Sequence, residues 1–457
     1  MSNVKKAERL FGTDGIRGRY GEGWLTPERV EALAQVIGAV LCPAGKGRAL
    51  LGHDGRRSGP LLEAALMRGL AKSGVSTSSA GLITTPALAL AGALQPFDLT
   101  VMISASHNPA RDNGIKVFGP AGTKVGDDVE RQIEERVQAN LESLLADVQA
   151  TETSQGVPHD SSIESEYLDS LSQSFADLKL SELSIVVDAA NGGGSRIAAR
   201  ALGRLGARVI SFADTPDGEN INENCGSTHP GQLMNLVQQN SADLGIALDG
   251  DGDRCMLVDA QGNLVHGDGI LTVLARYAAE EGQLADPRIV ATVMSNKGLH
   301  KALAEVGVSV LTTVVGDRAV VEAMRAEGLQ LGGEQSGHII CGAEHHFIGD
   351  GIYTALRVLR VMCARQLPLA SLTAPYIEFP QVLLNLQVSR KPPFDQISGV
   401  QEAVALVETE LGEDGRVLLR YSGTESLARV MVEGPSEALI AELAERIALP
   451  LRAAIGV

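Results

Sequence analysis

The sequence has no long apolar run and no excess of positive charge. No stretch approaches the roughly 20 consecutive apolar residues of a membrane-spanning helix, and the polar residues 1–9 lack the apolar centre of a signal peptide. Lysine and arginine number 39 against 56 aspartates and glutamates, so the net charge is -17, which opposes general binding to nucleic acid or anionic lipid. We therefore expect a cytoplasmic protein with no nucleic-acid and no membrane partner.

Cysteine and the common nucleotide-binding motifs are also scarce. Five cysteines are scattered along the chain and none forms a Cys-x-x-Cys pair, so we expect reduced, mostly structural thiols. A Walker loop before Lys46 would need glycine at Val40 and a hydroxyl residue at Gly47. A dinucleotide turn at residues 191–197 would need glycine at Ile197. Neither ATP nor NAD is indicated.

A chain of 457 residues is too long for one hydrophobic core, and a repeated pattern divides it. An apolar helical run ends in a glycine turn and is followed at once by a β-branched strand, which is typical of an α/β unit. The pattern occurs at residues 61–75, 197–209 and 299–310. This spacing is far beyond that of a solenoid and predicts three related α/β domains.

The character of the chain changes at two places. Residues 151–162 are polar and predict a connection after the first domain, and a second break falls at residues 375–380. Beyond it, residues 382–388, 417–420 and 427–432 predict antiparallel strands, followed by a helix over 436–448. The last domain is therefore expected to be smaller and of the α+β type.

The strongest chemical signal is the run Asp249-Gly-Asp251-Gly-Asp253-Arg254, directly after the predicted buried strand 244–248. Carboxylates this close repel one another unless a cation binds them, and hard oxygen ligands suit Mg²⁺ or Ca²⁺. An EF-hand loop is excluded because its sixth and twelfth positions would be Arg254 and Ala260. A solvated acidic turn is the remaining alternative.

A second signal is Ser104-Ala-Ser106-His-Asn-Pro109, which follows the predicted strand 99–103. A serine at a tight strand exit can present its oxygen to a ligand, and Lys116 nearby can offset phosphate charge. Serine, asparagine and proline also build purely structural turns, so the motif alone leaves both interpretations open.

Two further loops carry polar groups between glycines. Residues 332–338 contain Glu334, Ser336 and His338, which can hydrogen-bond sugar hydroxyls. Residues 420–425 offer Arg420, several hydroxyls and a glycine amide, which suit a phosphate. A surface turn and a plain hairpin are the respective alternatives.

Taken together, these four loops, one in each predicted domain and in this order, resemble the α-D-phosphohexomutase superfamily over nearly the whole chain. The resemblance implies three related α/β domains with mixed sheets plus a smaller C-terminal α+β domain around a central cleft. The implied domains are 1–157 with a phosphoserine loop, 158–262 with a metal loop, 263–375 with a sugar loop and 376–457 with a phosphate loop.

Within the superfamily, residues 11–18, 220–230 and 334–338 are most similar to the bacterial branch that interconverts glucosamine 6-phosphate and glucosamine 1-phosphate. The resemblance implies that the partner is a sugar phosphate and that a homodimer can form. A glucose- or mannose-phosphate mutase of the same superfamily and a non-catalytic sugar-phosphate binding protein remain alternatives. The pair His345-His346 has no evident place in the pattern.

The resemblance also implies roles for the residues of the four loops. Ser106 would carry the phosphoryl group and, with Asp249, Asp251 and Asp253, would bind one Mg²⁺. Arg17, Lys116 and Arg254 would position the reacting groups, with Lys116 accepting the proton, a role that requires a lowered pKa. The sugar and the second phosphate would be bound by Glu334, Ser336, His338, Arg420, Ser422, Gly423 and Thr424. Glucosamine 1,6-bisphosphate would be the intermediate or activator.

Overall fold

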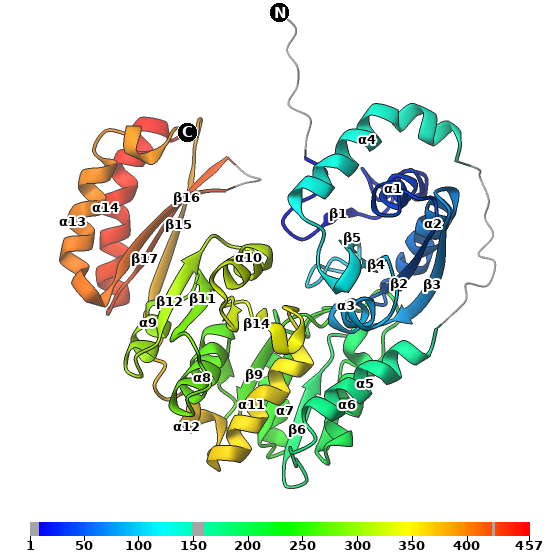
Figure 1. The fold of residues 1–457 in the computed structure, drawn as a ribbon. Coiled ribbons are helices and arrows are strands. Elements are labelled where there is room, and N and C mark those ends of the chain that lie inside the picture. The colour runs from blue at the N-terminus through cyan, green and yellow to red at the C-terminus, as the bar shows by residue number, and fades with distance from the viewer. Residues whose placement is uncertain (1–8, 149–159, 423–425) are drawn as a thin grey trace, which may run out of the picture.

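The computed structural model describes residues 9–148, 160–422 and 426–457. Four sheets follow one another around an arc, so that the N-terminal and C-terminal domains stand at its two ends (Figure 1). Of the predicted connection at residues 151–162, residues 151–159 lie outside the described part of the chain. Within the described chain, no helix is long and apolar enough to cross a membrane.

The first domain contains a mixed sheet of order β1-β5-β4-β2-β3, in which β2, β3 and β4 are parallel and β5 is antiparallel to β4. Every residue of β4 is buried, because helices cover both faces of the sheet. The elements are β1 (Ile16–Arg19), α1 (Pro27–Leu41), β2 (Gly47–His53), α2 (Gly59–Lys72), β3 (Val75–Leu82), α3 (Thr85–Leu94), β4 (Leu99–Ile103), β5 (Asp112–Phe118), η1 (Pro120–Gly122) and α4 (Asp127–Ala146).

The second domain repeats this topology in the order β10-β9-β8-β6-β7, with β6, β7 and β8 parallel and β9 antiparallel to β8. Its elements are α5 (Ser162–Ser174), β6 (Ser184–Asp188), η2 (Gly193–Ser195), α6 (Ala198–Arg204), β7 (Arg208–Phe212), α7 (Gly231–Gln239), β8 (Leu244–Leu248), β9 (Cys255–Asp259) and β10 (Leu264–Val265).

The third domain has the same topology in a four-stranded sheet of order β12-β11-β13-β14. Its elements are α8 (Gly267–Glu280), β11 (Arg288–Thr292), α9 (Lys297–Ala304), β12 (Ser309–Thr313), α10 (Asp317–Glu327), β13 (Leu331–Gly333), β14 (Ile339–Cys341), η3 (Ala343–His345), α11 (Gly351–Arg365) and α12 (Leu369–Thr373). The predicted three related domains are confirmed, and the glycines that end their repeated helices, Gly74, Gly206 and Gly307, all have positive φ.

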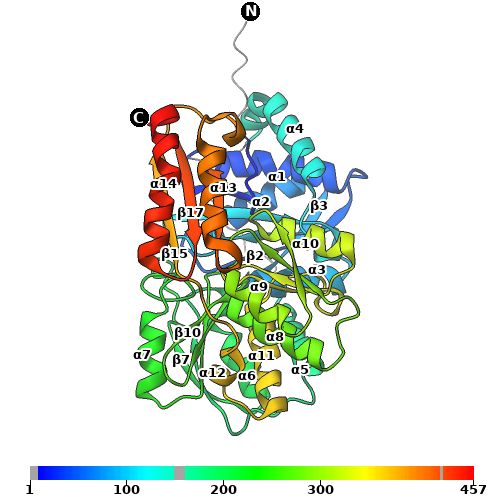
Figure 2. The same ribbon diagram turned by 90° about the vertical axis from the view of Figure 1, so that its left-hand side faces the viewer.

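The C-terminal domain is a three-stranded antiparallel sheet of order β15-β17-β16, with α13 and α14 side by side against it (Figure 2). This confirms the smaller α+β domain. The last helix is longer than predicted and continues past Pro450, because the buried Leu451 and Ile455 keep its final turns packed. The elements are β15 (Gln381–Gln387), η4 (Phe394–Gln396), α13 (Val400–Leu411), η5 (Gly412–Asp414), β16 (Arg416–Tyr421), β17 (Leu427–Glu433) and α14 (Glu437–Ile455).

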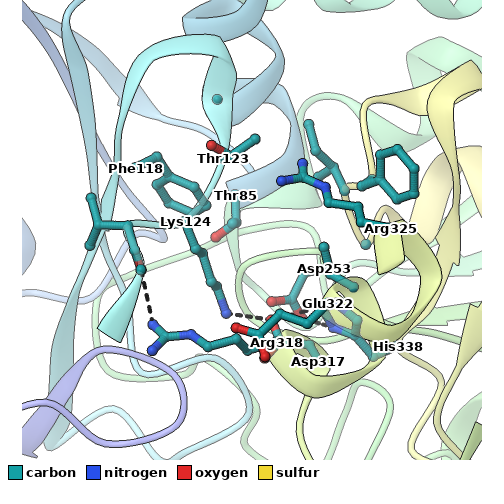
Figure 3. A pocket seen from close by; sticks show the side chains of 17 residues that line it. Thr85, Phe118, Thr123, Lys124, Asp253, Asp317, Arg318, Glu322, Arg325 and His338 are labelled. Carbon is teal, nitrogen blue, oxygen red and sulfur yellow. Dashed lines mark hydrogen bonds and ion pairs between the residues drawn. The ribbon is translucent and has the colours of Figure 1, made fainter. Parts of the chain in front are cut away.

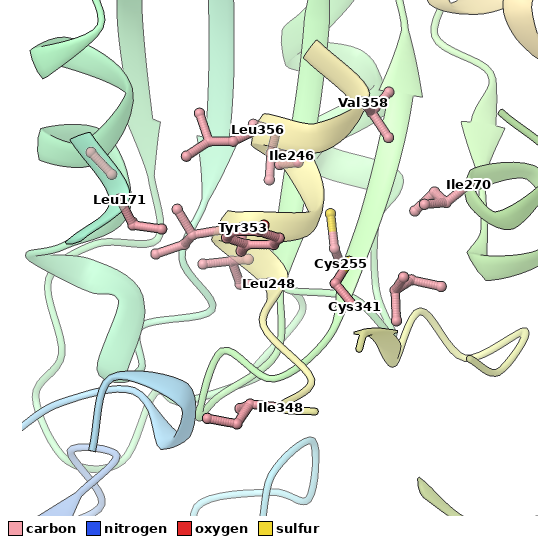
Figure 4. Close-up of a cluster of buried hydrophobic side chains, with 14 of the residues drawn as sticks. Leu171, Ile246, Leu248, Cys255, Ile270, Cys341, Ile348, Tyr353, Leu356 and Val358 are labelled. Carbon is pink, nitrogen blue, oxygen red and sulfur yellow. The ribbon is translucent and has the colours of Figure 1, made fainter. Parts of the chain in front are cut away.

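The hydrophobic cores show which domains are joined firmly. One continuous core runs from the first domain through the second and third, and within it α11 places Tyr353 and Leu356 beside Ile246 and Leu248 of the second sheet (Figure 4). The C-terminal domain has a separate core. Its connection to the third domain is polar: Asn296 donates to the carbonyl of Phe379 at 3.0 Å and accepts from its amide at 2.9 Å. The C-terminal domain is thus attached to the third domain through polar contacts rather than a shared core.

Candidate active site

Three equivalent loops of the repeated domains meet at one place. Ser106 follows β4, Asp249 follows β8 and Glu334 follows β13, and each of these strands holds the same position in its sheet. Ligands of open α/β sheets bind beyond the carboxyl ends of the strands, so the repeated topology directs these loops toward a common centre. Lys116 reaches the same centre from β5, and Arg17 lies on the neighbouring β1.

Ser106 is held in a left-handed backbone conformation, with φ of 53°. Its Oγ donates to Asp249 Oδ2 at 2.5 Å, and its side chain is buried. A non-glycine residue in this region costs about 1 to 2 kcal/mol, so the surrounding structure must impose the conformation. The structure therefore brings together the predicted phosphoryl carrier and the acidic loop.

Arg56 supplies much of that support, although no motif in the sequence marks it as a site residue. It is fully buried, and its guanidinium donates to the carbonyls of Ser106 and Asn108 at 2.9 and 2.8 Å and to that of Asp112 at 2.9 Å. Its Nε pairs with buried Asp54 at 2.9 Å. One guanidinium thus donates to several carbonyls of the loop that contains Ser106.

The acidic loop fits a hard cation. Asp249, Asp251 and Asp253 are buried and place carboxylate oxygens within 4.8 Å of one another. Burial, together with the charges of Asp253 and Asp251, raises the pKa of Asp249 well above its usual range. Oδ1 of Asp251 has no hydrogen-bond partner among the described residues, and Oδ1 of Asp253 has only the imidazole of His338 at 3.5 Å. Buried, unsatisfied carboxylate oxygens in such a group are the donor set that Mg²⁺ binds.

Lys116 lies within this acidic group. Its Nζ is 2.7 Å from Asp251 Oδ2, 3.0 Å from Asp253 Oδ2 and 3.0 Å from Asp14 Oδ2. Burial disfavours the ammonium form, but the three carboxylates outweigh it and hold the pKa of Lys116 well above its usual range. The expected lowering of this pKa is therefore wrong for this arrangement, because carboxylates rather than cations surround the lysine.

A cavity of about 580 Å³ lies at this centre and is lined by residues of three domains. It brings together Arg17, Arg254, Glu334 and His338 with Asp253. Ser106 and Lys116 lie beneath it with about 1% of their surface exposed. Ser336 lines a neighbouring cavity, which shares Arg254 and Glu334 with the first.

His338 is the cationic member of the sugar loop. Burial alone would lower its pKa, but the carboxylates of Asp253, Asp317 and Glu334 raise it to about 9. His107, next to the serine, behaves in the opposite way, because burial and the charges of Arg254 and Arg17 lower its pKa to about 4. At neutral pH the cleft therefore holds one protonated and one neutral imidazole.

Only part of the predicted phosphate loop lies within the described residues. Gly423 and Thr424 lie outside the described residues. Arg420 is the penultimate residue of β16 and lies opposite Arg429 of β17, and burial together with that second guanidinium lowers its pKa. Arg420 and Ser422 line neither of the two cavities described above.

The unplaced histidine pair has a structural explanation. His345 is buried, its Nε2 lies 2.8 Å from Asp350 Oδ2, and its ring stacks on Tyr353 with centroids 3.7 Å apart. Asp350 also caps α11 and accepts from the hydroxyl of Tyr167. His345 therefore packs against the start of α11, and Asp350 links that helix to Tyr167 of the second domain. His346 stands in a left-handed turn beside it.

Models of a known family match the chain along most of its length. The models of the phosphoglucomutase/phosphomannomutase family match residues 8–143 with α/β/α domain I, 165–262 with domain II, 266–379 with domain III and 383–449 with the C-terminal domain.

Curated relatives and solved structures agree with this match. A protein of Mycolicibacterium paratuberculosis named phosphoglucosamine mutase is 45% identical over 98% of this chain and 99% of its own length. One of the same name from Koribacter versatilis is 41% identical over 99% and 98%. A phosphoglucomutase/phosphomannomutase family protein of Burkholderia thailandensis has a similar fold, with a TM-score of 0.79 at 24% identity and 97% coverage of both chains. N-acetylphosphoglucosamine mutase of Aspergillus fumigatus, solved with GlcNAc-6P and magnesium, gives 0.64 at 18% identity and 97% and 95% coverage.

Proposed function

The chain belongs to the phosphoglucomutase/phosphomannomutase family and is a phosphohexomutase, and from this premise we propose that it interconverts glucosamine 6-phosphate and glucosamine 1-phosphate. The full-length relatives named phosphoglucosamine mutase support the choice of sugar. The observation that carries the proposed chemistry is the hydrogen bond from Ser106 Oγ to Asp249, in the middle of the acidic loop.

We propose that Ser106 carries the phosphoryl group. The bond between Oγ and phosphorus breaks as a sugar hydroxyl oxygen bonds to the phosphorus, and the hydroxyl proton ends on Oγ. The product is glucosamine 1,6-bisphosphate. After it turns over in the cleft, the second phosphate returns to Ser106 by the same exchange. Positioning and charge stabilisation supply most of the rate in phosphoryl transfer, and the crowded, charged centre suits that requirement.

Asp249, Asp251 and Asp253, with an oxygen on Ser106, would hold the magnesium ion. When bound, Mg²⁺ neutralises the charge that develops on the phosphoryl oxygens. Arg17 and Arg254 line the cleft and would hold the reacting phosphate by charge and hydrogen bonds. Lys116 enters as an ammonium group, so it would donate a proton from Nζ to Oγ of Ser106, and the amine so formed would accept the proton of the sugar hydroxyl.

The remaining predicted residues would bind the rest of the substrate. Glu334, Ser336 and His338 border two adjoining cavities and would bind the sugar hydroxyls. Arg420, Ser422, Gly423 and Thr424 would bind the phosphate that is not reacting. An acidic chain can hold an anionic substrate in this way because its basic groups are local to the cleft.

Intact mass and kinetics test the carrier. Ser106→Ala should lose phosphate from the purified protein and lower kcat at least a thousandfold, about 4 kcal/mol of barrier. Ser309→Ala, at an exposed position on β12, is the matched control and should match the wild type. Retained activity in Ser106→Ala would disprove the carrier role.

The choice of sugar is tested separately by comparing kcat/KM for the two sugar phosphates. A value for glucose 1-phosphate more than tenfold above that for glucosamine 1-phosphate would favour a glucose-phosphate mutase.

A further inference from the structure

Six side chains around the reaction centre form a closed ring of alternating charge, here called the charge ring. Three come from the first domain, one from the second and two from the third. In order around the ring they are Lys116, Asp14, Lys124, Asp317, His338 and Asp253. Three of them, Asp14, Lys124 and Asp317, have no role in the reaction proposed above, and Lys124 and Asp317 form the link between the first and third domains.

The contacts of the charge ring are close and largely shielded from solvent. Lys124 Nζ lies 2.5 Å from Asp14 Oδ1 and also pairs with Asp317. His338 Nε2 is 3.9 Å from Asp317 Oδ2, and its Nδ1 is 3.5 Å from Asp253 Oδ1. The Lys124 and Asp317 side chains are 20% and 15% exposed. At such burial an ion pair is screened less than at the surface, and losing one partner leaves the other uncompensated.

Lys124 forms the contact of the charge ring that joins the first domain to the third, through its ion pair with Asp317. Figure 3 shows its side chain reaching toward Asp317, with His338 and Asp253 beside it. On one side Lys124 holds Asp14, which contacts Lys116. On the other it holds Asp317, which faces His338. The ammonium group of Lys124 therefore contacts two carboxylates, one beside Lys116 of the first domain and one beside His338 of the third.

We propose that Lys124 and Asp317 are positioning residues that hold Lys116 and His338 in register across the boundary between the first and third domains. This inference rests on the function proposed above. The competing explanation is a simple clamp, which would hold the two domains together without setting the reaction centre.

A second contact between the first and third domains provides a control that tests the clamp explanation. Arg318 follows Asp317 in the sequence and also reaches from the third domain to the first. Its guanidinium donates to the Glu130 carboxylate at 2.5 and 2.9 Å and to the carbonyl of Val125 at 3.2 Å. Glu130 is buried, so this contact is at least as costly to break as that of Lys124. Arg318 belongs to the same interface and lies outside the charge ring.

The test compares Lys124→Met, Asp317→Asn and Arg318→Met by steady-state kinetics and thermal unfolding. A displaced group costs a large factor in rate, so Lys124→Met should lower kcat about tenfold or more with KM changed less than about threefold. Arg318→Met should lower Tm at least as much while keeping kcat within about twofold of wild type. Lys124→Arg, which keeps the charge, should recover part of the lost kcat.

Two further variants sharpen the test. The double variant Lys124→Met/Asp317→Asn should lose less than the product of the two single losses, because it leaves neither charge unpaired. Lys72→Met removes another lysine that bridges two carboxylates, Glu31 and Asp147, away from the cleft, and should leave kcat unchanged.

Equal losses of kcat in Lys124→Met and Arg318→Met would establish the clamp and overturn the proposal, as would no loss in Lys124→Met. Each ratio to wild type is measured with whichever of glucosamine 1-phosphate and glucose 1-phosphate the wild type converts. A wrong choice of sugar therefore shows in the wild type, and a wrong role for Lys124 shows in the ratio.

Discussion

At the scale of single residues, the serine loop depends on a side chain that is distant in sequence. The turn at Ser106 points several carbonyls inward, and a buried carbonyl without a donor costs roughly 1 to 3 kcal/mol. Arg56 satisfies those of Ser106, Asn108 and Asp112, and Asp54 balances its charge. The strained conformation of the serine is thus stabilised from the other side of the loop.

Replacing Arg56 should therefore destabilise the protein and the site together. Arg56→Leu leaves Asp54 buried without its partner, and we expect the free energy of unfolding to fall by about 3 to 5 kcal/mol. Denaturant unfolding measures this loss. Arg57→Leu is the control, because Arg57 is 80% exposed in its pair with Glu219 and should change stability by less than about 1 kcal/mol. Similar losses in both variants would contradict the role given to Arg56.

At the scale of elements, the loop between β8 and β9 is the part of the site that short-range chemistry explains best. Glycines between the aspartates let the backbone fold three carboxylates inward. The repeated sheet topology then places this loop beside the loops that follow β4 and β13. A loop that is acidic by itself becomes a candidate metal site because two other strand ends meet it.

Magnesium should stabilise the folded protein through this loop. A ligand bound only by the folded state, at about 100 times its Kd, adds about 2.7 kcal/mol, so Tm should rise on adding Mg²⁺. Asp251→Asn should abolish most of that rise. Asp128→Asn, at a position 92% exposed, should keep it. An equal rise in both variants would mean that the ion binds elsewhere.

At the scale of the whole molecule, the C-terminal domain differs from the other three in having a core of its own. The first three domains share one continuous core, whereas the C-terminal domain is joined through polar contacts at Asn296 and Arg416, so we expect it to be the domain that moves. Arg420 and Ser422 stand away from the cleft in this arrangement. Binding a substrate with two anionic ends would draw them inward, and opening would let the bisphosphate turn over.

Closure should be visible by small-angle scattering. The radius of gyration should fall when glucosamine 6-phosphate is added to the wild type, because domain 4 approaches the cleft. Arg420→Ala should show no such fall, since the guanidinium that would bind the distal phosphate is missing. Arg446→Ala, an exposed arginine on α14 of the same domain, is the control and should close normally. Closure in Arg420→Ala would show that another group draws the domain in.

The sequence by itself determined the three related α/β domains, the α+β domain and the order of the four loops, because strand patterns, glycine turns and the Asp-Gly-Asp-Gly-Asp run are local signals. It also predicted which residues would gather around Ser106 and the acidic triad, and the structure places most of them there. The domain limits and the individual residue roles stay predictions.

Only the tertiary structure decided what surrounds those residues. No local pattern marks Arg56 as the support of Ser106, or Lys124 as the link between Asp14 and Asp317, since each partner lies far away in the chain. The same is true of Lys116, whose pKa depends on carboxylates from two domains. Charge and burial in a cleft are sums over neighbours that only folding brings together, and for that reason the sequence could name the reacting serine without showing what holds it in place.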